Sequence, residues 1–231
     1  MIRPDVNPAG EPLARAAATD LRVEPNACGV EIELPGTGLR FLHSFLTGPI
    51  ARRAGQSTQL LLKACNNKQR NVHGILDLTA GWGVDAFVLA RHGHSVTLLE
   101  QDKRVHGIVA HSLQRLAQDQ ALAATAAAMK LHHCAALRYL HSLDPEHGYD
   151  CIYLDPMFAA HKSGAKPAKE MQILQALTVN SDIEECLQLA RSLARKRVVV
   201  KRSAKAPALG SQPPDLVQRA RSIRFDIYLT A

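Results

Sequence analysis

The chain has 231 residues, enough for one sizeable α/β domain with a small appendage at one end. Hydrophobic residues make up 46% of the sequence, so a packed core can form, and no apolar run approaches the length needed to cross a bilayer. The N-terminus lacks the apolar core of a secretory signal, so we expect a cytoplasmic protein with no membrane partner. The five scattered cysteines contain no C-x-x-C pair, which argues against a disulfide framework and against a metal site.

The formal net charge of +7 suggests a polyanionic partner. Five Lys or Arg and no acid lie between Ala51 and His73, and ten Lys or Arg with one acid lie between Arg191 and Arg224. Two basic segments that flank a catalytic core would suit a groove that follows a nucleic-acid backbone. The alternative, a solvated face that only aids solubility, stays open.

The first part of the chain predicts a small α+β extension. Residues 1–29 contain four prolines and little periodicity, and we expect a loose arm there. Val30–Leu34 alternates apolar and polar side chains, and Leu39–Leu42 follows after a Pro-Gly-Thr-Gly turn, which predicts a β-hairpin. Residues 46–66 favour a helix that is broken near its middle, at Gly55. We expect the extension to cover residues 1–72.

From residue 73 to residue 231 the pattern changes to strands that alternate with helices, and we expect this part to be the catalytic domain. The expected strands are Ile75–Thr79, Ser95–Leu99, Leu131–His133, Tyr149–Leu154, Arg197–Lys201 and Arg224–Leu229. Helices are expected at about 84–91, 102–118, 167–178 and 182–194, with an Ala-rich helical connection at 121–128. Strands and helices that alternate at this spacing predict an α/β fold with a doubly wound, mostly parallel sheet.

A glycine-rich turn follows the first strand of this domain. Thr79–Ala86 matches G-x-G-x-x-G/A in the strand–turn–helix context that the motif requires. Gly81 can supply the tight turn, Gly83 lets the backbone approach a ligand, and Ala86 permits close helix–strand packing. Glu100 ends the second strand, where its carboxylate can accept hydrogen bonds from both ribose hydroxyls of an adenosine moiety. This pattern fits a dinucleotide or S-adenosylmethionine.

The fourth strand runs into the tetrad Asp155-Pro156-Met157-Phe158, which faces the ligand crevice and suits amino-group methylation better than hydride transfer. Asp155 can accept one N–H of an exocyclic amine and the carbonyl of Pro156 can accept the other, which orients the weakly nucleophilic nitrogen. Pro156 fixes φ and so aims its carbonyl. Phe158 offers a stacking face to an extruded base. The alternative is a strand-ending turn with Phe158 in the core.

These residues resemble the RsmJ family, bacterial methyltransferases that modify N2 of a guanine near the 3′ end of 16S ribosomal RNA. The similarity runs from about Val30 to Tyr228, and its most unusual strings are Tyr153–Phe158 and Lys196–Arg202. The resemblance implies a Rossmann-like class I methyltransferase fold with a seven-stranded sheet. It also implies S-adenosyl-L-methionine as the cofactor, and 16S rRNA or the small ribosomal subunit as the partner.

Motif and resemblance together imply cofactor contacts at the strand ends and the turns that follow them, at Asp77, Gly81, Gly83, Val84, Asp85, Glu100, Gln101, Ala135, Ala136 and Asp155. Three departures from the family pattern matter. The family usually carries Arg in place of Val84, a basic residue in place of Gln101, and a Ser pair in place of Ala135 and Ala136. Side-chain hydrogen bonds from these positions are lost or altered here, although backbone contacts could survive.

Basic residues around the tetrad, after the fifth strand and in the extension predict a contiguous RNA-binding patch. The candidates are Arg52, Arg53, Lys162, Lys166, Lys169, Lys201 and Arg202. Charges there could hold phosphates around a flipped guanine.

Three alternatives stay open. An amino-methyltransferase acting on adenine N6 or on a DNA base would use the same tetrad, and only the RsmJ resemblance favours guanine N2. An NAD-dependent oxidoreductase would need a proton-relay residue, and none is well placed. A non-catalytic ribosome-assembly factor with a relict cofactor fold would explain the departures, but the intact Asp77, Glu100 and Asp155 argue against it. The sequence is silent on the oligomeric state.

Overall fold

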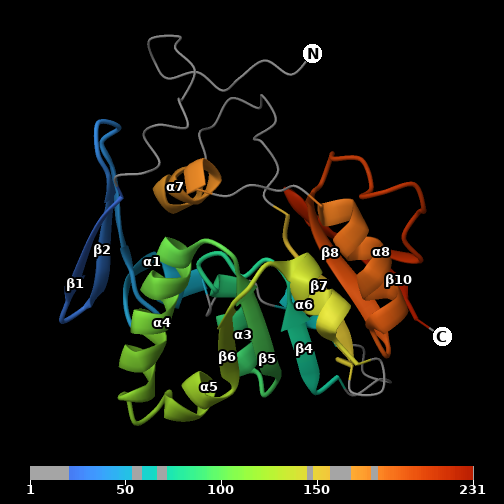
Figure 1. The fold of residues 1–231 in the computed structure, drawn as a ribbon, viewed down its shortest axis with the longest axis horizontal. Coiled ribbons are helices and arrows are strands. Elements are labelled where there is room, and N and C mark those ends of the chain that lie inside the picture. The colour runs from blue at the N-terminus through green and yellow to red at the C-terminus, as the bar shows by residue number, and fades with distance from the viewer. Residues whose placement is uncertain are drawn as a thin grey trace.

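The computed structural model describes residues 21–53, 59–66, 72–144, 148–156, 168–177 and 182–230. A small antiparallel sheet from the N-terminal part of the chain packs beside a larger sheet that carries helices on both faces (Figure 1). Within the described residues, no helix is both long enough and apolar enough to cross a bilayer.

The larger sheet has seven strands, and their order in the sheet differs from their order in the chain. From edge to edge they are β6 (Met129–His133), β5 (Ser95–Glu100), β4 (Gly74–Asp77), β7 (Cys151–Leu154), β8 (Arg197–Ser203), β10 (Ile223–Leu229) and β9 (Leu216–Arg219). The first five are parallel, and β10 is antiparallel to both of its neighbours. The order therefore reverses between β4 and β7, which creates a switch point. The predicted doubly wound, mostly parallel sheet is confirmed.

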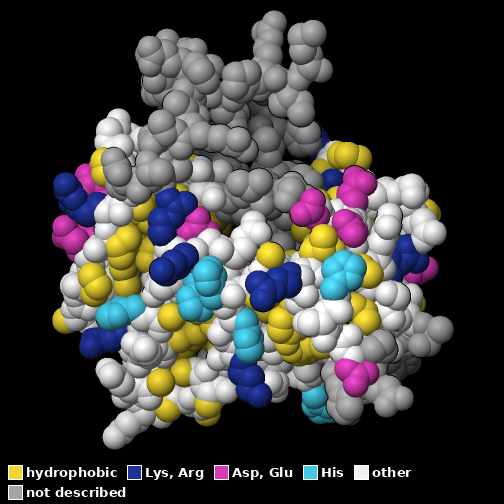
Figure 2. Space-filling model, in the orientation of Figure 1, with side chains coloured by type: hydrophobic (Ala, Val, Ile, Leu, Met, Phe, Trp, Pro, Cys, Tyr) yellow, Lys and Arg dark blue, Asp and Glu magenta, His cyan; other side chains and the backbone are white. Residues whose placement is uncertain are grey.

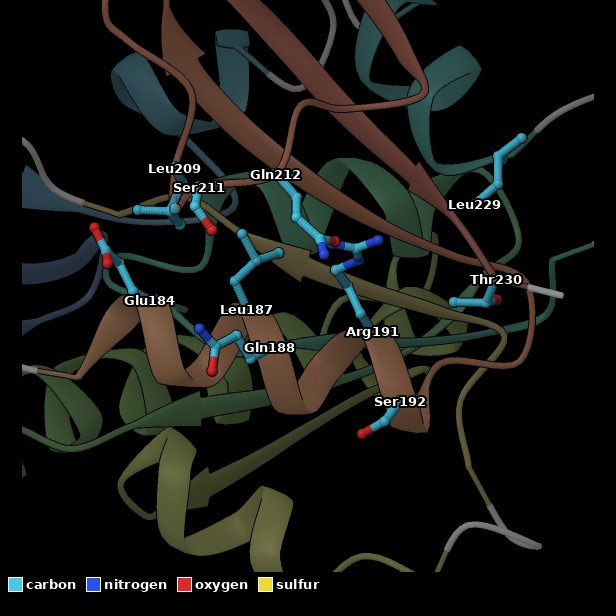
Figure 3. A pocket seen from close by; sticks show the side chains of 11 residues that line it. Glu184, Leu187, Gln188, Arg191, Ser192, Leu209, Ser211, Gln212, Leu229 and Thr230 are labelled. Atoms are coloured by element: carbon cyan, nitrogen blue, oxygen red, sulfur yellow. The ribbon is translucent and has the colours of Figure 1, made fainter.

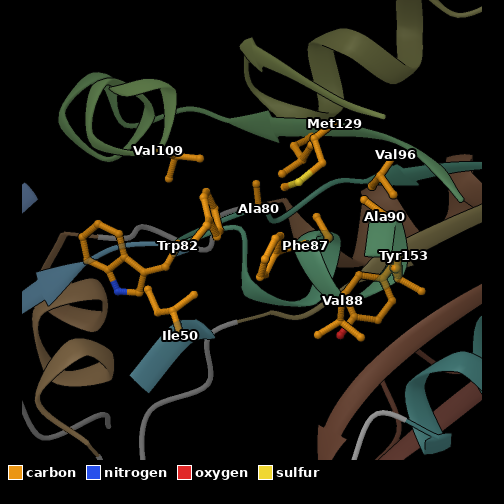
Figure 4. Close-up of a cluster of buried hydrophobic side chains, with 14 of the residues drawn as sticks. Ile50, Ala80, Trp82, Phe87, Val88, Ala90, Val96, Val109, Met129 and Tyr153 are labelled. Atoms are coloured by element: carbon orange, nitrogen blue, oxygen red, sulfur yellow. The ribbon is translucent and has the colours of Figure 1, made fainter. Parts of the chain in front are cut away.

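Alternating side chains on the central strands separate two apolar cores. On β4, Ile75 faces one core and Leu76 the other, and Tyr153 and Ile152 on β7 divide in the same way. Because both faces are covered, these strands form continuous apolar runs in the sequence. The first core, part of which is drawn in Figure 4, packs under α1 (Gly48–Arg53), α2 (Gln59–Cys65), α3 (Val84–Arg91), α4 (Lys103–Ala117), α5 (Ala123–Ala127) and α7 (Lys169–Leu177). The second packs under α6 (Ala136–Ser142) and α8 (Ile183–Leu193).

The N-terminal sheet contains one strand that the sequence did not predict. β2 (Gly29–Leu34) and β3 (Leu39–His43) form the predicted hairpin, and β1 (Arg22–Asn26) adds antiparallel to β2. The expectation of a loose arm over residues 1–29 is therefore wrong from residue 22 onward, and residues 1–20 lie outside the described part. All five residues of β1 are exposed, so no buried face marks this strand in the sequence.

The helices of the extension lie within the predicted range 46–66. α1 and α2 occupy its two halves, and the expected break near Gly55 falls at residues 54–58, outside the described part. α2 packs against β8, where the buried Arg197 donates a hydrogen bond from Nη1 to the carbonyl oxygen of Ala64 at 2.9 Å. Arg197, which belongs to the predicted basic groove, thus binds the extension to the larger sheet.

His43 joins the extension to the catalytic part. Its ring is buried, with Nδ1 2.7 Å from Ser112 Oγ and Nε2 2.9 Å from the carbonyl oxygen of Trp82. Burial lowers the pKa of His43 to about 4, so the ring is neutral at neutral pH. The next aromatic residue, Phe45, packs on Phe87 with ring centroids 4.9 Å apart. The packing is continuous across this boundary, and the division into residues 1–72 and 73–231 stays a prediction.

Candidate active site

Three strand ends meet at the carboxyl edge of the sheet, beside the switch point. β4 ends at Asp77, β5 ends at Glu100, and Asp155 directly follows β7. Parallel register aligns these ends, because β4 pairs with both β5 and β7. In doubly wound folds ligands bind outside this edge. The sheet therefore brings the three predicted carboxylates to the place where such folds hold ligands.

The turn after β4 is tied to both neighbouring strands. The N–H of Thr79 donates to Asp77 Oδ1 at 3.0 Å, and the N–H of Ala80 donates to the carbonyl oxygen of Leu99 at 3.1 Å. The hydroxyl oxygen of Thr79 accepts the backbone N–H of Asp155 at 2.6 Å. Sequence reasoning missed this role, although a hydroxyl side chain in a turn that faces two strand ends is a signal for such a link.

Both motif glycines adopt the left-handed region, with φ of +50° at Gly81 and +69° at Gly83. A Cβ at Gly81 would lie 2.8 Å from Leu174 Cδ2, so this glycine lets α7 close over the turn. A Cβ at Gly83 would lie 3.2 Å from Phe45 Cζ. The missing Cβ of Gly83 thus makes room for Phe45, and the expectation that the backbone at Gly83 approaches a ligand stays a prediction.

Glu100 fixes the turn from the side of β5. It is buried, and its Oε2 accepts the N–H of Gly81 at 3.0 Å while Oε1 accepts the N–H of Asp102 at 2.7 Å. Burial raises the pKa of Glu100 to about 7, against the lowering effect of these two hydrogen bonds. Each oxygen keeps a further lone pair, so the two oxygens can accept hydrogen bonds from the two ribose hydroxyls of an adenosine moiety.

Asp155 belongs to an ion-pair cluster with Lys201 and Asp85. The Nζ atom of Lys201, on β8, lies 2.8 Å from Asp155 Oδ2 and 2.8 Å from Asp85 Oδ2. The hydroxyl of Tyr153 donates to the same oxygen of Asp85 at 2.6 Å. The prediction that Lys201 belongs to an exposed RNA-binding patch does not fit this arrangement, because its ammonium already holds two carboxylates.

The cluster shifts the titration of its members. Burial by itself would lower the pKa of Lys201, but the charges of Asp155 and Asp85 raise it above its usual range. Burial raises the pKa of Asp155, and Lys201 opposes that rise. Burial also acts to raise the pKa of Asp85, but Lys201, Tyr153 and Arg53 together outweigh it, and the pKa is lowered. Burial raises the pKa of Asp77 to about 8, with a contribution from the neighbouring carboxylates. Lys201 thus pairs with two carboxylates, and its charge also acts on Asp77.

The other predicted cofactor positions lie at the same edge. Val84 begins α3 and Gln101 follows β5, where its carbonyl oxygen is 3.1 Å from His133 Nε2. Ala135 is the N-cap residue of α6, with no hydrogen bond from its side chain to the helix, and Ala136 is the first helical residue. Only backbone groups at the two alanines can hydrogen-bond a ligand.

The described RNA-binding candidates divide into exposed and buried residues. Arg52, Arg53 and Lys169 are exposed on α1 and α7. Arg53 Nη2 pairs with Glu170 Oε1 at 2.6 Å, which links the two helices. Arg202 is buried and donates to the carbonyl oxygen of Pro207 from Nε at 3.1 Å and Nη2 at 2.6 Å. The prediction that Arg202 faces RNA is therefore corrected. The remaining candidates Lys162 and Lys166, and the catalytic candidate Phe158, lie outside the described residues.

The basic residues of the predicted groove between Arg191 and Arg224 include a buried group and an exposed group. The buried ones are Arg197, Arg202 and Arg224, and the exposed ones are Arg195, Lys205, Arg219 and Arg221. The buried Arg224 pairs with Asp226, Nε to Oδ1 at 2.7 Å and Nη2 to Oδ2 at 2.9 Å, and Lys196 pairs with Asp150 at 3.1 Å. On the face in Figure 2, the described Lys and Arg side chains are interspersed with histidines and apolar side chains rather than gathered in one patch. The charges of Arg224 and Lys196 are therefore paired within the protein, whereas the exposed basic residues of the segment remain accessible.

A pocket of about 480 Å³ lies along α8 (Figure 3). Leu187 and Arg191 of α8, Gln212 from the segment before β9, and Thr230 after β10 line it. The guanidinium of Arg191 donates to Gln212 and stacks over the ring of Tyr228, 5.0 Å from its centroid. None of the predicted catalytic or cofactor-binding residues contributes to this pocket.

Comparisons with known proteins identify the family and the fold. The SAM-dependent methyltransferase family model matches residues 36–230. The ribosomal RNA small subunit methyltransferase J of Marinobacter nauticus is 38% identical over 189 residues, which cover 80% of this chain and 68% of that protein. The protein of the same name from Thioalkalivibrio sulfidiphilus is 33% identical over 246 positions and covers 94% of this chain and 96% of its own length.

A solved structure of an SAM-dependent methyltransferase from Neisseria gonorrhoeae has a TM-score of 0.69 and 29% identity, covering 89% of this chain and 85% of that chain. The seven-stranded sheet is thus the class I methyltransferase fold, and S-adenosyl-L-methionine is the cofactor. The alternative of an NAD-dependent oxidoreductase is wrong. The chain belongs to the ribosomal RNA small subunit methyltransferase J family of S-adenosylmethionine-dependent enzymes.

Proposed function

We propose that the chain methylates the N2 amino group of a guanine in the 16S rRNA of the small ribosomal subunit. The observation that carries this proposal is the state of the Asp155 carboxylate. Its Oδ2 is held by Lys201, whereas Oδ1 accepts no hydrogen bond from the described part of the chain. Asp155 Oδ1 can therefore accept a hydrogen bond from an amine, at the same carboxyl edge of the sheet where Glu100 can accept the hydroxyls of the cofactor ribose.

On the cofactor side, Glu100 accepts the ribose hydroxyls, and the backbone of the turn at Gly81 approaches the ligand. S-adenosyl-L-methionine supplies the methyl group from a sulfonium and leaves as S-adenosylhomocysteine. The site's own contribution is to hold the amine in line with that methyl group and to exclude water. Burial disfavours the ionised form of Glu100 and so raises its pKa. Two hydroxyl donors stabilise that ionised form when the cofactor binds.

On the substrate side, Asp155 accepts one N–H of the guanine amine and the backbone carbonyl of Pro156 accepts the other. These two bonds favour a more tetrahedral nitrogen with an available lone pair. Once the nitrogen carries the methyl group it must lose a proton, and a carboxylate whose pKa is raised by burial can accept it. Phe158 is proposed as the stacking face for the flipped base.

The substrate rests on the chain's relatives and its charge. The relatives from Marinobacter nauticus and Thioalkalivibrio sulfidiphilus are named as small-subunit ribosomal RNA methyltransferases, and a net charge of +7 suits an RNA partner. The exposed Arg52, Arg53 and Lys169 are proposed to contact phosphates, together with Lys162 and Lys166. Adenine N6 stays the alternative target, because an Asp-Pro-x-aromatic tetrad serves that amine too.

The test is product analysis. Small subunits from a strain that lacks its own enzyme are incubated with the purified protein and S-adenosylmethionine, and the rRNA nucleosides are separated by mass spectrometry. We expect N2-methylguanosine. N6-methyladenosine would move the target to adenine, and no methylated nucleoside from a protein that binds the cofactor would contradict small-subunit RNA as the substrate.

Asp155→Asn supplies the matched inactive enzyme for this assay. The substitution keeps the shape of the side chain but removes the charge, so product should disappear while cofactor affinity, measured by calorimetry, changes only a few-fold. Asp150→Asn is the control at the other end of β7, where Asp150 accepts the N–H of His73 at 3.0 Å and pairs with Lys196. Equal losses of turnover and cofactor binding in Asp155→Asn would contradict its role at the amine.

A further inference from the structure

We propose that Lys201 is a positioning residue for methyl transfer, which keeps the Asp155 carboxylate ionised and turned so that Oδ1 is left for the substrate amine. This inference rests on the proposed role of Asp155 and goes beyond it. Lys201 acts through Asp155 and need not touch either substrate. The sequence alone had suggested a phosphate contact for this lysine.

The direction of the Lys201 side chain follows from strand alternation. On β8, Val199 faces the first apolar core and Val200 the second, so Lys201 points to the same face as Val199, toward α3. Asp85 lies in the first turn of α3, and Asp155 follows the neighbouring strand β7. Lys201 on β8 thus lies between the N-terminus of α3 and the carboxyl end of β7.

Two independent restraints fix Asp155. Its backbone N–H is held by Thr79 Oγ1 at 2.6 Å, and its side-chain Oδ2 is held by Lys201 Nζ at 2.8 Å. The side chains of Lys201 and Asp155 are 23% and 29% exposed, so water has limited access to the pair. With the main chain and one carboxylate oxygen fixed, the remaining oxygen has a defined direction.

The charge of Lys201 opposes every other influence on Asp155. The titratable groups of the described chain that act on Asp155 are Lys201 from β8 and Asp85 from α3. Asp155 in turn raises the pKa of Tyr153 on β7 and of Asp77 on β4. Burial and the carboxylate of Asp85 both raise the pKa of Asp155, and Lys201 is the group that lowers it. A protonated Asp155 would lose acceptor strength toward the amine.

Asp85 and Tyr153 keep Lys201 in place. Asp85 Oδ2 accepts from both Lys201 Nζ and the hydroxyl of Tyr153, and Arg53 adds a favourable charge near Asp85. The ion-pair group of Lys201, Asp85 and Asp155 carries a formal charge of −1, which complements the positive sulfonium that the site receives. Asp85 therefore positions Lys201, and its Oδ2 already accepts hydrogen bonds from two protein side chains.

The test compares Lys201→Met, Lys201→Arg and Lys196→Met by kcat, KM and pH profile on small subunits. Lys196 is the matched control, because it pairs with Asp150 at the amino end of the same strand. In Lys201→Met we expect kcat at pH 7 to fall about tenfold or more, with the loss shrinking as the pH rises because the acid limb moves to higher pH. Lys201→Arg should recover most of kcat, and Lys196→Met should match the wild type.

A loss in Lys201→Met that is equal at every pH, or no loss at all, would overturn the proposal. If the wild type is inactive on small subunits, that result contradicts the proposed substrate and not the role of Lys201. The Lys201–Asp155 pair is then tested in the protein without substrate. Carbon-13 NMR of labelled aspartate should show Asp155 titrating at higher pH in Lys201→Met than in the wild type. If Lys201→Met does not fold, Asp85→Asn gives the opposite sign, since loss of that charge should shift the Asp155 titration to lower pH. An unshifted titration in the folded variant overturns the proposal.

Discussion

The hydroxyl oxygen of Thr79 accepts the backbone N–H of Asp155 at 2.6 Å, and this bond joins the two halves of the site. Thr79 belongs to the glycine turn that follows β4, and Asp155 follows β7, the strand on the far side of the switch point. A parallel sheet aligns these strand ends but does not fix the turns beyond them. The Thr79 hydroxyl supplies that link, so the cofactor turn and the amine acceptor are held as one unit.

Replacing Thr79 by Val should separate the two halves while keeping the branched shape of the side chain. The N–H of Asp155 would lose its acceptor, and the free energy of unfolding should fall by about 1–2 kcal/mol, as for an unsatisfied polar group. We expect kcat to fall more than cofactor affinity, since the shift is at the amine acceptor. Thr79→Ser, which keeps the hydroxyl, is the control. A kcat in Thr79→Val equal to that of Thr79→Ser would contradict the role of the bond.

The sequence predicted the strands and turns that are marked by neighbouring residues, either as a short apolar run or as a motif. β4 and β7 are buried on both faces and form short apolar runs in the sequence, and the segments that follow them carry the motif residues Gly81 and Asp155. β9, over Leu216–Arg219, was missed because it has four residues and no buried side, and among the described strands it pairs with β10 alone. β1 was missed for the same reason, because Arg22–Asn26 buries no side chain.

The roles of the basic residues could not be predicted from composition. Lys201 and Arg202 are neighbours in the sequence, but strand alternation sends them to opposite faces of the sheet, one to the carboxylates and the other to the carbonyl of Pro207. The alternation of side chains along a strand could have indicated from the sequence that these two residues face opposite sides of the sheet. The partner of Lys201 could not be predicted in this way, because Asp85 lies on α3, far away in the sequence, and meets Lys201 only through the fold. Asp226, in contrast, is two residues from Arg224 on β10, so the same alternation could have indicated that pair.

Cofactor affinity should fall as the pH drops through about 7. Glu100 has a raised pKa of about 7 in the free protein, and ribose hydroxyls donate to its ionised form, so binding lowers that pKa and releases a proton. Below pH 7 the proton must first be removed, which weakens binding by up to about tenfold per pH unit.

Calorimetry from pH 6 to pH 8.5 in two buffers of different ionisation enthalpy measures both the affinity and the released proton. Glu100→Gln carries no titrating carboxyl, so it should bind the cofactor more weakly and with a flat pH dependence. A wild-type affinity that does not change between pH 6 and pH 8 would show that Glu100 does not receive the ribose.

The exposed basic residues beside the glycine turn should contribute to RNA binding through phosphates. Arg52 on α1 and Lys169 on α7 flank the Arg53–Glu170 pair, next to the helix that covers Gly81. Arg52→Ala and Lys169→Ala should each weaken RNA binding and lower the slope of log affinity against log salt by about 1. Lys130→Ala is the control, because Lys130 is exposed at the amino end of β6, on the opposite edge. Slopes that match the control would remove both residues from the RNA surface.

The N-terminus of α6 can be improved by one substitution. Ala135 is its N-cap residue, with extended backbone at φ −70° and ψ 137° and no side-chain cap, and it is exposed, so a larger side chain has room. Ala135→Ser should raise the free energy of unfolding by about 1 kcal/mol, because the hydroxyl can accept an orphan N–H of the first turn. Ala136→Ser, one position inside the helix, should not.

The same pair of variants tests what the departure from the family pattern costs in cofactor binding. If the serine side chain of the family reaches the cofactor from this position, Ala135→Ser or Ala136→Ser should tighten binding in calorimetry. If backbone groups make the contact, the affinity should stay unchanged while Ala135→Ser still unfolds at a higher temperature. A fall in stability of Ala135→Ser would contradict the capping argument, because it would mean that the exposed N-cap cannot accept a hydroxyl.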